Sequence, residues 1–357
     1  MDIKEIEKRL AKKGRLTDRE ALELFASEDI HSLGEAANKV SARKTKKLTF
    51  FIRNMHINPG NICINRCKFC AFSKSRGEEG AYSYTIDQMV EKAAWANGRV
   101  SEFHVVGGLN PEMGLGFYSD LFRALKEAAP GVYIKALTAV EIDYIAKSSR
   151  ISSNKALEVL RGAGLDSMPG GGAEIFNPKV RDRLCPEKIP ARRWLQIHES
   201  AHKLGIKTTA TMLFGHLESY HDRVDHLRRL RELQDKTGGF LAFIPLPFHP
   251  KNTRITATHP ISGLDILKTI SISRLYLDNF DHIKAYWIMT GEKLAQVCLL
   301  YGADDLDGTV IEERITHAAG AESKEAMTVD DIIRTIKKAG KVPVERDTFY
   351  NHLRVWE

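Results

Sequence analysis

From about residue 48 onward, short apolar runs alternate along the chain with longer stretches in which apolar residues recur every three or four positions. The short runs predict buried strands and the longer stretches predict amphipathic helices. The predicted strands are 48–57, 102–106, 132–137, 166–168, 208–214, 240–246, 283–289 and a weak last one at 303–306. The predicted helices between them are 86–96, 118–128, 153–163, 191–204, 218–234 and 264–279.

This alternation predicts an α/β fold, because parallel neighbouring strands can be joined only by crossovers, which the helices supply. Eight strand–helix units in about 260 residues have the count and length of a (β/α)8 barrel of the TIM type. An open doubly wound sheet is the alternative, and it would normally carry a glycine-rich phosphate loop after the first strand. That position holds a group of cysteines instead, which favours the barrel.

The two ends of the chain differ from this repeat. Residues 1–46 predict an N-terminal helical segment that caps one end of the barrel, with capping boxes at Thr17–Glu20 and Ser32–Glu35. After the barrel at 47–310, residues 311–357 predict a C-terminal helical extension whose tail, from about residue 342, looks irregular. The sequence indicates no separate second domain.

Composition narrows the class of protein. Hydrophobic residues make up 43% of the chain and charged residues 28%, as in an ordinary folded protein with a large core. No apolar run approaches membrane-spanning length and the first residues are charged, so we expect a cytoplasmic protein without membrane insertion. The net charge of +7 includes no basic stripe interleaved with aromatics. Nucleic acid is therefore not the expected partner, and an anionic small substrate or an acidic electron-donor protein fits the sign of the charge.

Three of the five cysteines lie close together, at Cys63, Cys67 and Cys70. Three thiolates can hold three corners of a four-iron cluster and leave the fourth iron open to a ligand. The alternative is a zinc site, which would need a fourth protein ligand such as His56. Cys185 and Cys298 stand alone and are expected to be small buried hydrophobes.

The Cys-x3-Cys-x2-Cys spacing, with Phe69 before the third cysteine and its place after the first strand, resembles the signature of radical S-adenosylmethionine (SAM) enzymes. The resemblance implies a [4Fe–4S] cluster held by the three cysteines, with SAM bound to the open iron. It also implies reductive cleavage of SAM to a 5′-deoxyadenosyl radical.

Segments 56–63, 105–111, 134–143, 166–176 and 211–216 are similar to the group that makes menaquinone through futalosine and to the deazaflavin-forming enzymes. Segments 137–143, 282–289, 303–309 and 342–348 resemble the aminofutalosine synthase (aminodeoxyfutalosine synthase) family most closely. Asn110 departs from the pattern, because relatives usually carry His before the proline.

The resemblance implies that the adenosyl radical adds to 3-[(1-carboxyvinyl)oxy]benzoate, a dicarboxylate, and gives 6-amino-6-deoxyfutalosine with SAM as co-substrate. A cyclic dehypoxanthine futalosine synthase or a deazaflavin-synthase-like enzyme is the alternative within the group. A non-catalytic iron–sulfur or zinc protein is the alternative from another class. An acidic donor such as flavodoxin or ferredoxin would supply the electron, and Arg66 could contact it or raise the cluster potential.

Site residues follow from the resemblance together with their places at strand ends, where a barrel builds its active site. Expected cofactor contacts are Phe69 with adenine, Gly107 and Gly108 with the methionine amino group, and Glu141 with the ribose hydroxyls. Glu141 has a second interpretation as a helix N-terminal acid. The expected catalytic residues are His56, His216 and Glu174, and the expected substrate contacts are Asn58, Gly170, Gly171, Gly172, Asp305 and Thr309.

Overall fold

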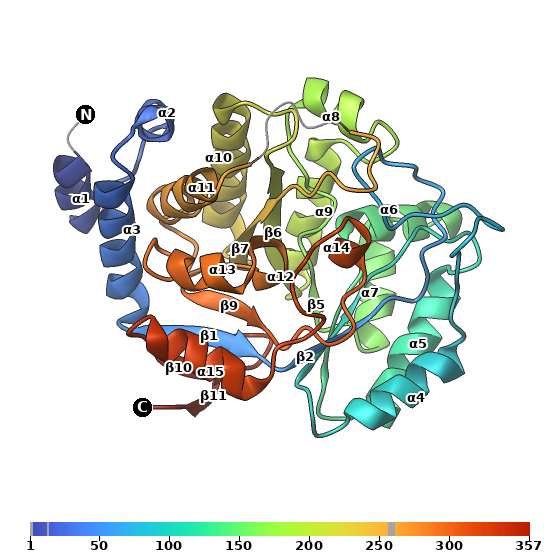
Figure 1. Ribbon diagram of the computed structural model, residues 1–357. Helices are drawn as coiled ribbons and strands as arrows, with labels where there is room; N and C mark the ends of the chain where they lie inside the picture. The colour runs from blue at the N-terminus through green and yellow to red at the C-terminus, as the bar shows by residue number, and fades with distance from the viewer. Residues whose placement is uncertain (1–2, 13, 256–260) are drawn as a thin grey trace.

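The computed structural model describes residues 3–12, 14–255 and 261–357 (Figure 1). Its centre is a seven-stranded parallel sheet in the order β2-β3-β4-β5-β6-β7-β8. The strands are β2 (Asn54–Ile57), β3 (Glu102–Val105), β4 (Tyr133–Ala136), β5 (Ser167–Met168), β6 (Lys207–Phe214), β7 (Phe240–Pro247) and β8 (His282–Ile283). The (β/α) alternation predicted from the sequence is confirmed for these strands.

Strand β9 (Asp305–Gly308) lies in a second sheet, which also contains β1 (Leu48–Ile52), and it runs between the two ends of the seven-stranded sheet. It pairs in parallel with β1, which runs directly into β2, and a bridge between Lys284 and Asp305 connects it to β8. The predicted first strand 48–57 is therefore two strands, separated at Arg53. The predicted strand 283–289 was too long, because β8 ends at Ile283 and the short helix α12 (Trp287–Thr290) begins after three intervening residues.

Helices surround the sheet on its outer face (Figure 1). The six predicted helices are found within a few residues of their expected bounds. They are α4 (Ile86–Ala96), α5 (Leu115–Ala128), α7 (Ser153–Gly162), α9 (Ala191–Lys203), α10 (Tyr220–Thr237) and α11 (Gly263–Tyr276). The periodicity missed α6 (Ala139–Ser148) and α8 (Pro178–Leu184), which are short and begin immediately after loops of the site. No helix among the described residues is long and apolar enough to cross a membrane.

The N-terminal helices α1 (Ile3–Ala11), α2 (Asp18–Ala26) and α3 (Ile30–Thr45) lie outside the barrel helices. Helix α3 packs against α11, and α2 packs against α10 and α11. The capping box Thr17–Glu20 begins α2 as predicted. The predicted capping box at Ser32–Glu35 was wrong, because Asp29 accepts the Ser32 N–H and caps α3 three residues earlier.

The C-terminal extension is more ordered than the sequence predicted. After α13 (Glu292–Cys298), α14 (Ile315–Ala318) and α15 (Val329–Lys338), the tail forms β10 (Val342–Arg346) and β11 (His352–Val355). Strand β10 pairs in parallel with β1, and β11 pairs antiparallel with β10. The tail then reaches the N-terminal ends of the barrel strands, where Phe349 packs edge-on against Tyr133. The prediction of an irregular tail was wrong because β1 has a free edge that β10 fills.

Candidate active site

A cavity of about 340 Å³ opens at the C-terminal ends of the strands and extends down into the barrel. One wall is the cysteine loop, residues 58–85 between β2 and α4, with Cys63, Cys67, Cys70 and Phe69 all facing the cavity. The loops after β3 and β5 supply Gly107, Gly108 and Gly170 to Gly172. Strand residues deeper in the barrel form the floor and the opposite wall.

Backbone hydrogen bonds hold the cysteine loop in place. The Leu109 N–H donates to the Sγ of Cys63 at 3.3 Å, and the Cys70 N–H donates to the Cys67 carbonyl at 3.1 Å. The Lys68 N–H donates to the Leu184 carbonyl at 3.0 Å, which ties the loop to α8. The three sulfurs are therefore presented to one cavity by a loop anchored on two sides.

Glycine is required where the next loop crosses the cysteine loop. A Cβ at Gly108 would collide with the backbone carbonyl of Ile62 and stand 3.0 Å from the Cβ of Cys63. At Gly107 a Cβ would stand 2.9 Å from the Gly60 carbonyl oxygen. Only glycine permits this close backbone approach. The sequence-predicted pair Gly107 and Gly108 thus lies against the cysteine loop, with both residues lining the cavity.

The thiols fit an iron–sulfur cluster by their number and their exposure to one cavity. Burial raises the pKa of the Cys67 thiol to about 12 and also raises that of Cys63, so metal binding must displace protons from them. Among the described residues, no three His, Cys, Asp or Glu side chains are grouped as ligands for one metal ion. A cube of four irons places each thiolate on a different iron and does not need that grouping.

Glu141 lines the cavity, and both of its oxygens are held by backbone amides. The Thr138 N–H donates to its Oε2 at 2.6 Å, which completes the capping box of α6, and the Gly107 N–H donates to its Oε1 at 3.3 Å. Burial raises the pKa of this carboxyl to about 7. The helix-capping interpretation is confirmed, while a contact with ribose stays a prediction.

The glycine loop after β5 continues into a buried ion pair. Glu174, held at a positive φ of 47°, accepts from the Nζ of Lys188 at 2.5 Å, and both side chains line the cavity. The ammonium of Lys188 lies 4.8 Å from the centre of the Phe69 ring. Burial alone would lower the pKa of Lys188, but the Glu174 carboxylate holds it above its usual range. Sequence reasoning found Glu174 and missed Lys188, which lies in a loop between two prolines and carries no periodic signal.

Charged and aromatic side chains from the middle of the strands close the lower part of the cavity. They are His56, His104, Lys135, Lys284 and Asp307. Burial would raise the pKa of Asp307, but the Lys284 ammonium holds it well below its usual range. Of this set, sequence reasoning found only His56. A lysine inside a buried apolar strand, as at Lys135, is the signal that could have found the others, because a buried charge needs a partner.

The structure does not bring four of the expected residues to the cavity. The ring of His216 bonds to the Leu213 carbonyl at 2.9 Å and lies beside Glu218, and Asn58 donates to the Val106 carbonyl at 2.8 Å. Thr309 bonds to the backbone of Asn54, and Asp305 is held by Arg346 and Tyr350. Their contacts are those of residues that support strand ends and loops.

Two residues that the sequence left uncertain also have structural contacts. Asn110, the departure from the relatives' pattern, donates to Ser83 at 3.3 Å and does not line the cavity. Arg66 donates to Glu78 at 3.0 Å at the outer side of the cysteine loop. Cys185 and Cys298 are buried, as expected for small hydrophobes.

Comparison with known proteins agrees with this site. The sequence profile of the Radical SAM superfamily matches residues 57–230, and that of the CofH/MqnC C-terminal region matches residues 237–357. The aminodeoxyfutalosine synthase of Thermus thermophilus is 45% identical over 96% of this chain and 94% of its own length. The chain belongs to the radical SAM superfamily. It is an enzyme of that type, and it uses a [4Fe–4S] cluster and SAM.

Other relatives show how broad the similarity within this superfamily is. The aminodeoxyfutalosine synthase of Streptomyces coelicolor is 40% identical over 99% of this chain and 95% of its own length. The 5-amino-6-(D-ribitylamino)uracil–L-tyrosine 4-hydroxyphenyl transferase of Methanoculleus marisnigri is also 40% identical, over 94% of each chain. Among solved structures, methylornithine synthase covers 95% of this chain with a TM-score of 0.78 and 18% identity, which shows a shared fold.

Membership in the radical SAM superfamily settles one of the questions that the cysteines raised. The alternative of a non-catalytic iron–sulfur or zinc protein is excluded, because the chain is a radical SAM enzyme. The three cysteines of the Cys-x3-Cys-x2-Cys motif all line the cavity, and their role as the cluster ligands stays a prediction.

Proposed function

We propose that this chain is an aminodeoxyfutalosine synthase. It joins the 5′-deoxyadenosyl group of SAM to the vinyl carbon of 3-[(1-carboxyvinyl)oxy]benzoate, with loss of one carboxyl group, and forms 6-amino-6-deoxyfutalosine for menaquinone synthesis. The observation that carries the proposal is the similarity to the synthases of Thermus thermophilus and Streptomyces coelicolor over nearly the full length of each chain. The similarity therefore includes the strands that form the floor of the cavity and the tail beyond them.

The cluster and SAM, when bound, supply an electron and the adenosyl group. The residues of the chain bind and orient the cofactors and the substrate, and they exclude water from the cavity. Cys63, Cys67 and Cys70 hold the cluster, and Gly107 and Gly108, which line the cavity beside the cysteine loop, contact the methionine end of SAM. Apolar side chains between that loop and the floor give a dry wall for the aromatic ring: Val106, Ile244, Leu246, Phe248 and Met289.

The charges that line the cavity suit a substrate with two carboxylates. Lys188 lies near the cysteine loop, and Lys135 and Lys284 lie deeper in the barrel. Each is paired with one acid, and each ammonium has three N–H donors, so further donors remain for ligand oxygens. Cations near the cysteine loop and cations deeper in the barrel together support binding of a molecule with a carboxylate at each end.

The test is an anaerobic incubation of the protein, reconstituted with iron and sulfide, with SAM, dithionite and 3-[(1-carboxyvinyl)oxy]benzoate. We expect a nucleoside adduct whose mass contains the adenosyl group, formed in step with methionine. In a parallel incubation with dehypoxanthine futalosine in place of the benzoate, free 5′-deoxyadenosine released in step with a cyclised product would instead identify a cyclic dehypoxanthine futalosine synthase.

A second incubation tests the activity of the relative from Methanoculleus marisnigri, which is as similar as one of the synthases. It replaces the benzoate by L-tyrosine and 5-amino-6-(D-ribitylamino)uracil. A coupled product there, with no adduct in the first incubation, would overturn the proposal.

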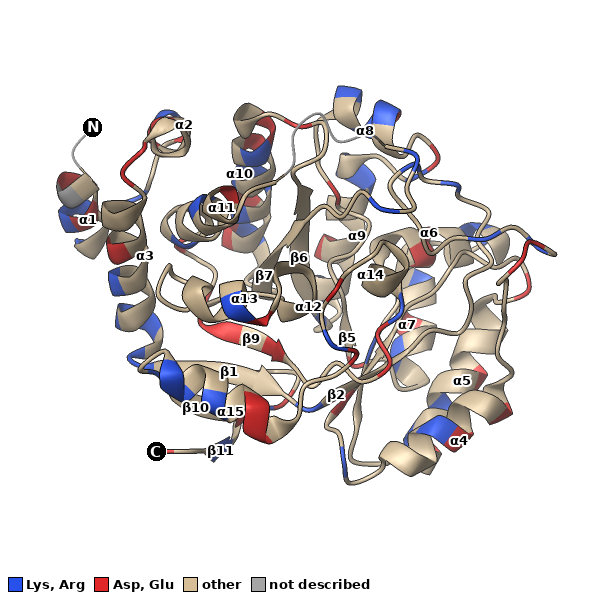
Figure 2. Ribbon diagram, viewed as in Figure 1, with Lys and Arg blue, Asp and Glu red and all other residues tan. Residues whose placement is uncertain are grey.

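An acidic protein such as flavodoxin or ferredoxin is the proposed electron donor. Four basic residues surround the outer side of the cysteine loop: Arg66, Lys68, Arg183 and Arg254. The Arg254 N–H donates to the Lys68 carbonyl at 2.7 Å, and Lys68 is joined to Leu184 beside Arg183. Figure 2 shows further basic residues on α8, which carries Arg183. Lys68 stands between Cys67 and Cys70 in the chain, so this surface adjoins the proposed cluster ligands.

A further inference from the structure

Two histidines at the bottom of the cavity form an unusual pair. His56 on β2 and His104 on β3 are register partners, and their rings stack with centroids 4.6 Å apart and planes 16° from parallel. Both side chains line the cavity. His56 is only 6% exposed, and neither of its ring nitrogens has a hydrogen-bond partner among the described residues. Buried polar groups in folded proteins are normally hydrogen-bonded, so an orphaned imidazole that faces a cavity points to a ligand.

The neighbours of this pair are donors of hydrogen bonds. Lys135 donates to Oε2 of Glu102 at 2.6 Å, and Lys284 donates to Asp307 at 2.5 Å. An ammonium carries three N–H groups, so each lysine keeps donors that can turn to the cavity. A ligand atom placed between Lys135 and Lys284 must therefore be an acceptor, and the N–H of the neutral His56 imidazole can donate to it as well.

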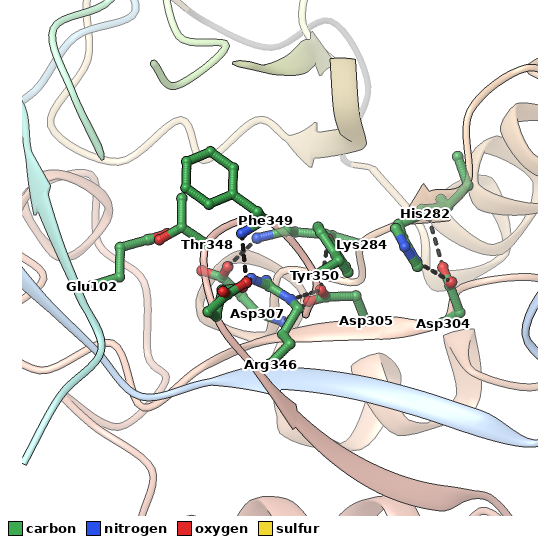
Figure 3. A network of polar contacts seen from close by, with 12 residues as sticks. Glu102, His282, Lys284, Asp304, Asp305, Asp307, Arg346, Thr348, Phe349 and Tyr350 are labelled. Atoms are coloured by element: carbon green, nitrogen blue, oxygen red, sulfur yellow. Dashed lines mark hydrogen bonds and ion pairs between the residues drawn. The ribbon is translucent and has the colours of Figure 1, made fainter. Parts of the chain in front are cut away.

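The charges of this region balance in pairs. Lys135 pairs with Glu102, Lys284 with Asp307, and Arg346 with Asp305. Figure 3 shows Arg346 and Asp305 close to Lys284 and Asp307, with Tyr350 also bonded to Asp305. The two histidines are neutral, because burial lowers the pKa of each. A carboxylate that enters would be the one unmatched charge, and a histidine that takes up a proton would match it.

We propose that the barrel floor, formed by His56, His104, Lys135 and Lys284, binds the carboxylate on the aromatic ring of the substrate. This assignment rests on the proposed function, and it fixes the direction in which the substrate lies. His104 precedes Gly107 by three residues, which is roughly 10 Å along an extended strand. The ring then lies against the apolar wall, and the enol ether end points up to the cysteine loop.

Proton uptake on binding is the distinguishing consequence. The groups that face His56 are His104, Lys135, Glu102, Asp307 and Glu313. Glu102 and Asp307 are already paired with lysines, and Glu313 is bonded to His317. These three acids therefore have partners before the substrate binds. A carboxylate bound beside His56 therefore favours the imidazolium form, and binding should draw a proton from the buffer.

The test compares wild type with His56→Leu and His56→Gln, each reconstituted with its cluster. Steady-state kinetics use 3-[(1-carboxyvinyl)oxy]benzoate and its ring carboxamide, both with SAM in excess. We expect His56→Leu to raise KM for the carboxylate about tenfold or more, with a much smaller change for the carboxamide and for kcat, because only a charged oxygen gains fully from the imidazolium. His56→Gln, which keeps one donor, should restore part of the affinity.

A control variant separates this effect from a loss of structure. His202→Gln changes a histidine that bonds to Thr208 and Thr237 outside the cavity, and it should leave KM for both compounds unchanged. Iron content and circular dichroism of His56→Leu should match those of wild type. An equal change of KM for carboxylate and carboxamide, or no change for either, would overturn the assignment.

A binding experiment keeps the assignment separate from the proposed function. Calorimetry of the reconstituted protein uses 3-hydroxybenzoate and 3-hydroxybenzamide in two buffers of different ionisation enthalpy. We expect wild type to bind 3-hydroxybenzoate and to take up a proton on binding, and we expect His56→Leu to lose the binding and the proton uptake. This result supports the assignment even where no adduct forms in the activity assay. Adduct formation by wild type together with unchanged benzoate binding in His56→Leu would overturn the assignment and leave the proposed function standing.

Discussion

Arg346 of the C-terminal strand β10 donates its Nε to Oδ2 of Asp305 on barrel strand β9 at 2.8 Å, and both side chains are fully buried. The Tyr350 hydroxyl donates to the same oxygen at 2.7 Å, and the Asp307 N–H donates to the other oxygen of Asp305. Asp307 in turn pairs with Lys284, which lines the cavity. The tail is thus connected to the floor of the active site through buried polar contacts (Figure 3).

Replacing Arg346 by Met should lower the free energy of unfolding by about 3–5 kcal/mol, because Asp305 would stay buried without its cation. Urea denaturation of the cluster-free protein under anaerobic conditions measures the loss. Arg19→Met is the matched control, since Arg19 forms an exposed pair with Glu23 that contributes at most about 1 kcal/mol. Equal losses in the two variants would contradict the structural role given to the tail.

Substitution of Gly108 by Ala should reduce cluster binding severely, because the added Cβ collides with the Ile62 carbonyl beside Cys63. Iron and sulfide content after reconstitution measures the effect. Gly116→Ala is the control: Gly116 lies in α5, and a Cβ there would have no atom within 4 Å. That variant should keep its full iron content and gain up to about 1 kcal/mol in stability from the lower entropy of its unfolded chain. Normal iron content in Gly108→Ala would contradict this account of the loop crossing.

The C-terminal tail and the cysteine loop show which features of a structure can be predicted from a sequence. The strand and helix alternation and the cysteine spacing are local patterns, and both predicted the structure well. The pairing of the tail with β1 is a contact between residues far apart in the chain, such as Val342 and Leu48, and no local pattern carries it. The same holds for His104, Lys135 and Lys284, which become neighbours only when separate strands come together in the barrel.

Glu141 gives the protein a pH dependence of stability. Burial raises its pKa from 4.5 to about 7, so the folded protein holds this proton more tightly than the unfolded chain. The stability from the protonated carboxyl is fully present below pH 4.5 and is lost as the pH rises to about 7. Glu141→Gln can still cap α6. This variant should remove about 2–3 kcal/mol of the difference in the free energy of unfolding between pH 5 and pH 8. Chemical denaturation of the cluster-free protein at both pH values checks this, and an unchanged difference would contradict it.

The assignment of the cluster ligands can be checked by measuring the iron content of two cysteine variants. Cys70→Ala should abolish cluster binding, because two thiolates and a cavity wall cannot hold the cube. Cys185→Ala should keep the full iron content, although Cys185 packs in the same apolar cluster as Cys67. Iron analysis and the visible absorption of reconstituted protein distinguish the two. Iron loss in Cys185→Ala as large as in Cys70→Ala would show that the ligand set has been misassigned.

Reversal of charge at Lys68 and Arg254 should slow the reaction only when a protein supplies the electron. Both side chains are exposed at the outer side of the cysteine loop, and an acidic donor would meet them before it reaches the cluster. Attraction between opposite charges raises association rates, and salt screens it. The double variant Lys68→Glu, Arg254→Glu should therefore lose at least tenfold in rate with flavodoxin and its reductase at low salt, while turnover with dithionite stays at the wild-type level. Lys39→Glu, on α3 far from the loop, is the control and should change neither rate. Equal losses with both reductants would show damage to the site rather than to a donor surface.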